Sequence, residues 1–312
     1  MFDWLSVITK RSLSFCLALL FVSLAIYDLR AANEPSRPRI LGIAGVRFFS
    51  TDIGAARSFY TQILDAKEIS PNAFAVNPQQ AVTLFDTPSP IPSSLLAEVV
   101  FETDDLATLL RYLQAQKIEV TPKLVSGIWH WDMSGLGYSA LSLVDPEGYR
   151  ISFVKRTKPG PGLVATKRPS TIRLIHAGFV VHDREAEDKF YKDILGFHVY
   201  WHGGMKEGED NWVDMQVPDG TDWLEYMLKV PDNASHKTLG VMNHIALGVP
   251  DIHKAQEQLI KNGWKGEEPK IGRDGKWQLN LYDPDETRVE LMEFTPTKDP
   301  CCSPYTGPHP HQ

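Results

Sequence analysis

The chain has 312 residues, of which 43% are hydrophobic and 23% are charged, and its formal net charge is −7. This much apolar sequence supports about two domains and excludes a chain that is mostly disordered. The acidic balance and the lack of a block of basic residues argue against a nucleic-acid-binding protein. Three cysteines are too few for a disulfide-built scaffold or a cysteine-rich zinc module.

The N-terminal segment has the pattern of an export signal. Lys10 and Arg11 precede an apolar run over residues 12–26, which is short for a membrane span. We therefore expect residues 1–32 to be a cleaved signal peptide or, alternatively, an uncleaved signal anchor. Either form places the folded part outside the cytoplasm, in the periplasm or the extracellular medium. Contact with a membrane is expected only through this segment, if it is not cleaved.

The remaining sequence repeats itself. A Phe-Tyr-x-x-Ile-Leu motif begins at Phe59 and again at Phe190, and each copy follows an aspartate, Asp52 or Asp183, at the same spacing. A repeat of this size indicates two copies of one unit. A segment rich in Lys, Pro and Gly separates them, and the C-terminal end lacks the residues of a core. The predicted boundaries are 40–156 for the first domain, 157–170 for a linker, 171–295 for the second domain and 296–312 for a flexible tail.

Each copy divides into halves of the same design. Four times a short apolar strand leads to an aspartate and then to an amphipathic helix, and β-rich segments with turn signals follow. The expected first strands cover residues 42–49, 97–101, 172–181 and 241–249. The helices are expected to start near Ile53, Asp105, Arg184 and Asp251. The repeating unit is therefore β-α-β-β-β, and it occurs four times.

Four such modules resemble the vicinal oxygen chelate (VOC) superfamily, which includes glyoxalase I, methylmalonyl-CoA epimerase, extradiol dioxygenases and bleomycin-resistance proteins. The most specific segments are residues 174–183, 242–249 and 283–292. The resemblance covers residues 40–295 and implies an α+β fold, in which four βαβββ modules pair into two glyoxalase-like domains. Each domain is then a curved, cup-shaped sheet with flanking helices. In this family the first and last strands of a module carry metal ligands.

Four side chains of the second copy occupy such positions. His176 and His244 lie on the first strands of its two modules, and Glu225 and Glu290 lie on the last strands. The resemblance implies that these four residues bind one divalent metal ion. Two imidazoles and two carboxylates suit Fe, Mn, Ni, Co or Zn.

Strand alternation adds a candidate substrate-binding set. Arg288 and Met292 share a face of the last strand with Glu290, because successive side chains of a strand point to opposite faces. We predict that Arg288, Met292 and Trp223 contact the substrate.

The first copy lacks the ligand set. Matching the two copies places Gly45, Glu98 and Ser152 at the positions of His176, His244 and Glu290. We therefore expect the metal site of the first domain to be degenerate and the role of this domain to be structural.

Three functions remain open from the sequence. The first is an exported, metal-dependent enzyme of the glyoxalase-like lyase or isomerase kind. It would act on a small molecule with vicinal oxygens through an enediolate-type intermediate, with Glu290 and Glu225 as the catalytic residues. The second is an extradiol-type ring-cleaving dioxygenase with non-haem Fe(II), although the segment before Glu290 lacks the histidine that this branch carries there. The third is a non-catalytic small-molecule-binding protein of the bleomycin-resistance kind. In each case the partner is a small molecule, and we expect a monomer or a homodimer.

Overall fold

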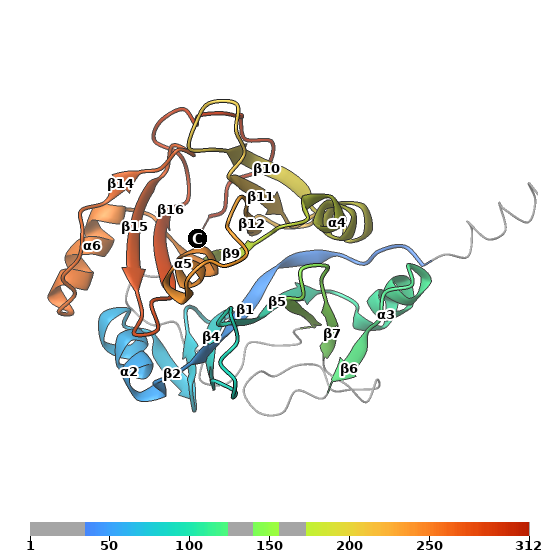
Figure 1. Ribbon diagram of the computed structural model, residues 1–312, viewed down its shortest axis with the longest axis horizontal. Helices are drawn as coiled ribbons and strands as arrows, with labels where there is room; N and C mark the ends of the chain where they lie inside the picture. The colour runs from blue at the N-terminus through green and yellow to red at the C-terminus, as the bar shows by residue number, and fades with distance from the viewer. Residues whose placement is uncertain (1–34, 124–139, 156–172, 312) are drawn as a thin grey trace, which may run out of the picture.

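The computed structural model describes residues 35–123, 140–155 and 173–311. The predicted export signal (1–32) and linker (157–170) lie outside these residues. Within them, no helix is both long and apolar enough to cross a membrane. Figure 1 shows two similar domains, each built on a curled sheet with helices along its outside.

The first domain is one eight-stranded sheet in the order β2-β3-β4-β1-β5-β8-β7-β6. Its strands are β1 (Ile40–Ser50), β2 (Lys67–Ser70), β3 (Ala73–Ala75), β4 (Ala81–Asp86), β5 (Leu96–Thr103), β6 (Thr121–Lys123), β7 (Ala140–Val144) and β8 (Arg150–Val154). Its helices are α2 (Ile53–Ser58), which continues into the π-helical turn η1 (Phe59–Ile63), and α3 (Leu106–Ala115).

The second domain repeats this arrangement in the order β10-β11-β12-β9-β13-β16-β15-β14. Its strands are β9 (Arg173–Val180), β10 (His198–Gly203), β11 (Trp212–Gln216), β12 (Trp223–Met227), β13 (His244–Val249), β14 (Lys270–Ile271), β15 (Trp277–Tyr282) and β16 (Arg288–Glu293). Its helices are α4 (Arg184–Glu187), which continues into η2 (Asp188–Ile194), α5 (His236–Met242) and α6 (Ile252–Lys261). The predicted α+β fold of four βαβββ modules is confirmed.

An aspartate caps the helix of each module. The side chains of Asp52, Asp105, Asp183 and Asp251 each accept a hydrogen bond from the backbone N–H three residues later. This bond satisfies a helix-terminal N–H that has no partner within the helix. The strand-aspartate-helix pattern of the sequence therefore marks the point where each chain segment leaves the sheet, and all four helices begin within one residue of the predicted starts.

The strand expected over residues 241–249 is shorter than predicted. Its first residues belong to α5, which Ser235 caps by accepting a hydrogen bond from the backbone N–H of Thr238 at 3.1 Å. The helix ends at Met242, so β13 begins at His244. The candidate ligand thus stands at the first residue of its strand, directly after a helix that fixes the entry of the chain.

The two domains share a continuous apolar core. At its edge, the buried side chain of Gln80 links them: its amide nitrogen donates to the carbonyls of Ile43 at 2.7 Å and Leu174 at 2.9 Å. The amide oxygen accepts from the backbone N–H of Leu174 at 2.8 Å. Leu174 precedes the candidate ligand His176 by two residues on β9. The first domain therefore holds in place the strand that carries part of the candidate metal site.

The C-terminal segment differs from the flexible tail that was expected at residues 296–312. The backbone N–H of Cys301 donates to Arg273 O at 2.8 Å, and that of Thr306 donates to Tyr200 O at 3.0 Å. Tyr305 packs against Tyr200 with ring centroids 4.7 Å apart. The segment has too few apolar residues for a core of its own, so it is held by backbone hydrogen bonds and ring contacts. Cys301 and Cys302 are joined by a disulfide.

Candidate metal centre

The sheet register brings the four predicted ligands together on two rungs that lie two residues apart, and therefore on one face of the sheet. One rung runs Glu225, Gly178, His244, and the other runs His176, Ala246, Glu290. A small residue therefore lies between the two ligands of each rung. A Cβ atom on Gly178 would lie 2.1 Å from Cε1 of His244, so only glycine leaves room for this imidazole.

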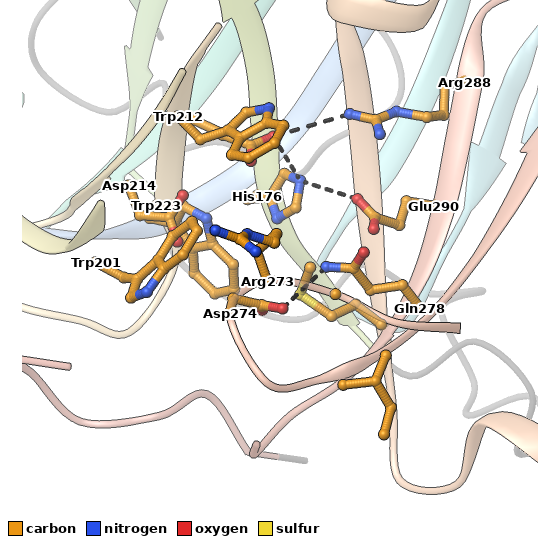
Figure 2. Close-up of a pocket in the computed structure, with 14 residues that line it drawn as sticks. His176, Trp201, Trp212, Asp214, Trp223, Arg273, Asp274, Gln278, Arg288 and Glu290 are labelled. Carbon is orange, nitrogen blue, oxygen red and sulfur yellow. Dashed lines mark hydrogen bonds and ion pairs between the residues drawn. The ribbon is translucent and has the colours of Figure 1, made fainter. Parts of the chain in front are cut away.

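The four side chains converge on one point of the second sheet, and Figure 2 shows two of them, His176 and Glu290, pointing toward each other. Nε2 of His176 lies 3.1 Å from Nε2 of His244, and Oε2 of Glu225 lies 3.1 Å from the latter atom. Oε2 of Glu290 lies 3.6 Å from Nε2 of His176 and 3.8 Å from Nε2 of His244. Both imidazoles and Glu290 are buried. His176, Glu225 and His244 alone already form a group with metal-binding spacing.

The chemistry of these atoms fits a bound cation. Nδ1 of His244 lies 2.9 Å from the carbonyl of Met242, to which only a protonated nitrogen donates. That tautomer leaves a lone pair on Nε2, the atom that faces the other ligands, and such a bond to the distal nitrogen is typical of metal-binding histidines. Lone pairs and carboxylate oxygens that converge in a buried site need a positive charge or a shared proton between them. Two imidazoles and two carboxylates therefore suit one divalent transition metal ion.

The surroundings shift the protonation of these groups. Burial lowers the pKa of His176 and of His244, and Arg288 lowers that of His244 further. Burial raises the pKa of Glu290 to about 8. The site thus favours neutral imidazoles, the form that binds metals.

In the first domain an arginine occupies the equivalent space. Arg47 pairs with Thr83 and Glu98 in the sheet, as Gly178 pairs with Glu225 and His244. Its guanidinium forms an ion pair with the buried Glu98, which also accepts a hydrogen bond from Ser152. The positive charge that a metal ion would supply at this point comes from a side chain of the protein.

A cavity of about 230 Å³ opens beside the four ligands. The three residues predicted to contact the substrate, Trp223, Arg288 and Met292, all line it. Trp223 packs on His176 with ring centroids 4.9 Å apart, and Nη2 of Arg288 lies 2.6 Å from Nε2 of His244. The structure therefore brings every sequence-predicted site residue into one place.

Several polar residues of the cavity were not predicted from the sequence. Asp214, Arg273 and Asp274 line it, and they come from β11 and from the turn before β15. Lys276 lies fully buried behind Trp223, with Nζ 4.5 Å from the centroid of that ring, and burial lowers its pKa. A signal for Asp214 was present, because it is a charged residue between Val213 and Met215 in an apolar strand. Arg273, Asp274 and Lys276 lie in a turn with no periodic pattern.

Comparison with solved structures finds similar folds. A variant of homoprotocatechuate 2,3-dioxygenase from Brevibacterium fuscum matches with a TM-score of 0.61 and 20% sequence identity, over 88% of this chain and 74% of that chain. The anaerobic complex of this dioxygenase with 3,4-dihydroxyphenylacetate matches with a TM-score of 0.59 and 19% identity, over 85% and 82% of the two chains. At this level of identity the likeness concerns the fold.

Comparison with sequences gives the family. No curated protein sequence matches. A family model described as "Glyoxalase/Bleomycin resistance protein/Dioxygenase superfamily" matches residues 42–153 and 173–291, one match in each domain. The two matches cover most of the chain and confirm the resemblance stated from the sequence. The chain therefore belongs to the glyoxalase/bleomycin resistance protein/dioxygenase superfamily.

Proposed function

We propose that this protein is a metal-dependent enzyme of the lyase or isomerase kind, which acts on a small molecule with two vicinal oxygens. The observation that carries the proposal is the convergence of two glutamates, one from the last strand of each module, on the same pair of imidazoles. A site with one carboxylate ligand leaves no second carboxylate for proton transfer. Here Glu225 and Glu290 supply two carboxylates, so that one remains available for proton transfer.

The four side chains His176, Glu225, His244 and Glu290 would hold the ion. When bound, a divalent ion supplies Lewis-acid polarisation of two adjacent substrate oxygens. Fe, Mn, Ni, Co and Zn all accept this donor set.

The proton transfer falls to a glutamate. Glu290 removes the proton from the carbon next to the substrate carbonyl, and the electron pair moves to the carbonyl oxygen to give an enediolate. The same carboxyl group then returns the proton to the neighbouring carbon, while the hydroxyl proton of the substrate passes to the former carbonyl oxygen, so that atoms and charge balance. Glu290 suits this role because it is buried and its Oε2 atom lies 3.6 Å from Nε2 of His176 and 3.8 Å from Nε2 of His244, next to the place of the substrate oxygens. Glu225 is the alternative base.

The test is turnover under argon in deuterated buffer with small α-hydroxy aldehydes and ketones. Proton removal by Glu290 predicts that deuterium enters the substrate carbon, and that Glu290→Gln abolishes this exchange. Glu293→Gln, on the opposite face of β16, is the matched control. Exchange at the wild-type rate in Glu290→Gln would refute Glu290 as the base.

A second candidate is an extradiol-type dioxygenase. It is supported by the His176, Glu225 and His244 group, since two histidines and one carboxylate are the ligand set of many non-haem Fe(II) oxygenases. The candidate is weakened because the segment 275–282 contains no histidine, and its tyrosine, Tyr282, is half exposed. Oxygen uptake with catechol, absent under argon, would favour this candidate over the first.

Export remains a proposal that rests on the sequence alone. Mass spectrometry of the protein from its host should find residues 1–32 missing, in whole or in large part, outside the cytoplasm. An intact Met1 in a cytosolic fraction would contradict export.

A further inference from the structure

Asp214 is a buried carboxyl group, and one of its two oxygens, Oδ1, has no hydrogen-bond partner among the described residues. Asp214 lies on β11, lines the cavity beside the candidate metal centre, and is only 4% exposed. A buried polar atom without a partner costs free energy, so such atoms are rare unless a ligand or water satisfies them.

The other unpredicted carboxylate of the cavity behaves differently. Oδ1 of Asp274 accepts hydrogen bonds from the side chain of Gln278 at 3.1 Å and from the backbone of Lys276 at 3.2 Å. Its Oδ2 accepts one from the hydroxyl of Tyr305 at 3.2 Å. Asp274 is therefore a structural carboxylate that the protein itself satisfies, and Asp214 stands out by comparison.

Lys276, a buried cation near Asp214, contacts other side chains. Nζ of Lys276 lies over the ring of Trp223 and 3.5 Å from the hydroxyl of Tyr200. Its charge attracts Asp214 from a distance, but it forms no hydrogen bond to Oδ1 of Asp214 and does not line the cavity. Oδ1 of Asp214 can therefore accept a hydrogen bond from a ligand in the cavity.

The sheet register defines the surroundings of Asp214. Its cross-strand neighbours are Trp201 on β10 and Glu225 on β12, and Trp212 shares its face two residues earlier on β11. All four residues line the cavity (Figure 2). Indole rings attract cations and pack well against flat or aliphatic groups. The neighbouring carboxylate of Glu225 would repel a ligand arm that ends in a carboxylate.

We propose that Asp214, with Trp201 and Trp212, forms a subsite for an arm of the substrate that ends in a hydrogen-bond donor, an ammonium or a hydroxyl group, and that this subsite rejects an arm ending in a carboxylate. Asp214 accepts the hydrogen bond, and the indoles enclose the arm. The inference rests on the proposed function only in one respect: the vicinal oxygens of the substrate are held at the metal centre.

The experiment uses catechols as vicinal-oxygen probes. Calorimetric titration of the metal-loaded full chain under argon compares unsubstituted catechol with three catechols whose short arms end in an ammonium (dopamine), a hydroxyl (3,4-dihydroxyphenylethanol) or a carboxylate (3,4-dihydroxyphenylacetate). We expect the ammonium or hydroxyl arm to bind at least about 10-fold more tightly than the carboxylate arm, which corresponds to about 1.4 kcal/mol.

Two substitutions separate the sources of that preference. Asp214→Leu, which has no acceptor, should bring the three arms within about threefold of one another. Asp214→Asn removes the charge and adds an N–H donor, so it should weaken the ammonium arm and strengthen the carboxylate arm, while the hydroxyl arm, which can pair with either side chain, should change least. Glu209→Gln, an exposed carboxylate on the segment before β11, is the charge-matched control and should leave the ratios unchanged. Ratios of dissociation constants do not depend on the folded fraction, and Asp214→Asn carries the test if Asp214→Leu does not fold.

Three results would overturn the inference. The first is a carboxylate arm that binds the wild type as tightly as the other two, above all if Arg273→Gln abolishes that affinity, which would place the arm at Arg273. The second is a preference that survives Asp214→Leu. The third is a failure of unsubstituted catechol to bind, which would refute binding through vicinal oxygens and the inference with it. Binding of catechol without discrimination among the arms would refute the inference alone.

Discussion

Nη2 of Arg288 lies 2.6 Å from Nε2 of His244 and 3.8 Å from Oε2 of Glu225. The Nδ1 atom of His244 is occupied by the carbonyl of Met242, so Nε2 carries the lone pair of the imidazole. The guanidinium therefore donates a hydrogen bond to the same lone pair that a metal ion would use. Arg288 competes with the metal for one ligand and also repels it by charge.

Removing this competitor should tighten metal binding. For Arg288→Met we expect the affinity for a divalent ion, measured by competition with a chromogenic chelator, to rise by about 10-fold, or about 1.4 kcal/mol. Arg273→Gln removes a positive charge that lines the same cavity but contacts neither histidine, so it should change the affinity by less than about threefold, about 0.65 kcal/mol. Weaker binding in Arg288→Met would show that the arginine supports the site.

Substitution of the two glutamates of β16 should have very different effects. Glu290 faces the imidazoles, whereas Glu293 accepts a hydrogen bond from the backbone N–H of Ile252 at 3.0 Å. Glu290→Gln should lower metal affinity by at least about 100-fold, because changes to residues that merely support ligands already cost about 10–100-fold. Glu293→Gln keeps its acceptor and should stay within about 0.5 kcal/mol of the wild type in stability and binding. Equal effects in the two variants would mean that the register of β16 is wrong.

Stability should fall as pH rises because of two carboxyl groups at the domain interface. Burial, with repulsion from Glu147, raises the pKa of Asp145 to about 7, and burial, with repulsion from Asp145, raises that of Glu187 to about 9. The folded protein then keeps protons that the unfolded chain releases above about pH 4.5. The stabilisation from these protons is complete below that pH and is lost as pH rises through the folded pKa values.

Glu187→Gln tests this linkage. The substitution keeps an acceptor for the backbone N–H of Glu147, which Glu187 binds at 2.9 Å, and it removes the titration. We compare the free energy of unfolding at pH 5 and pH 8 by urea denaturation. Between these values the wild type should lose at least about 1 kcal/mol more than the variant. An unchanged difference between variant and wild type at both pH values would exclude Glu187 as the titrating group.

The C-terminal segment should contribute to stability through Tyr305. Its hydroxyl donates to the carbonyl of Asp274 at 2.8 Å and to Oδ2 of the same residue at 3.2 Å. Tyr305→Phe should cost about 1–2 kcal/mol in urea denaturation, because it leaves a buried carboxylate with one donor fewer. Tyr282→Phe removes a hydroxyl from a half-exposed ring and should cost under about 0.5 kcal/mol. Equal costs would indicate that the segment is loosely held.

Most of the fold could be predicted from local sequence patterns. The aspartates that cap the module helices recur at fixed places in the sequence, and each marks a strand end and a helix start. The ligand positions could be predicted from the same repeat, because repeated modules place corresponding residues at corresponding positions of the sheet. The geometry of the convergence, with Gly178 and Ala246 between the ligands, needed the register of four strands that lie far apart in sequence.

Other features depend on contacts that no local pattern encodes. The polar turn of Arg273 and Asp274 lines the cavity and accepts hydrogen bonds from the C-terminal segment, which is distant from the candidate ligands in sequence. The same segment was predicted to be a flexible tail because backbone hydrogen bonds and ring contacts hold it, and these produce no periodic apolar pattern in the sequence. Arg47 looks like an ordinary polar strand residue until its place opposite Glu98 is known.

The central claim is one metal site per chain, built by the second domain, and metal stoichiometry tests it most directly. The full chain, stripped with a chelator and reloaded with excess divalent ion, is desalted and analysed by plasma mass spectrometry beside His244→Ala and Arg47→Ala. We predict about one ion per chain for the wild type and for Arg47→Ala, and less than about one tenth of an ion for His244→Ala, because a lost ligand weakens the site beyond retention. Two ions per wild-type chain, or one ion still bound by His244→Ala, would contradict the account.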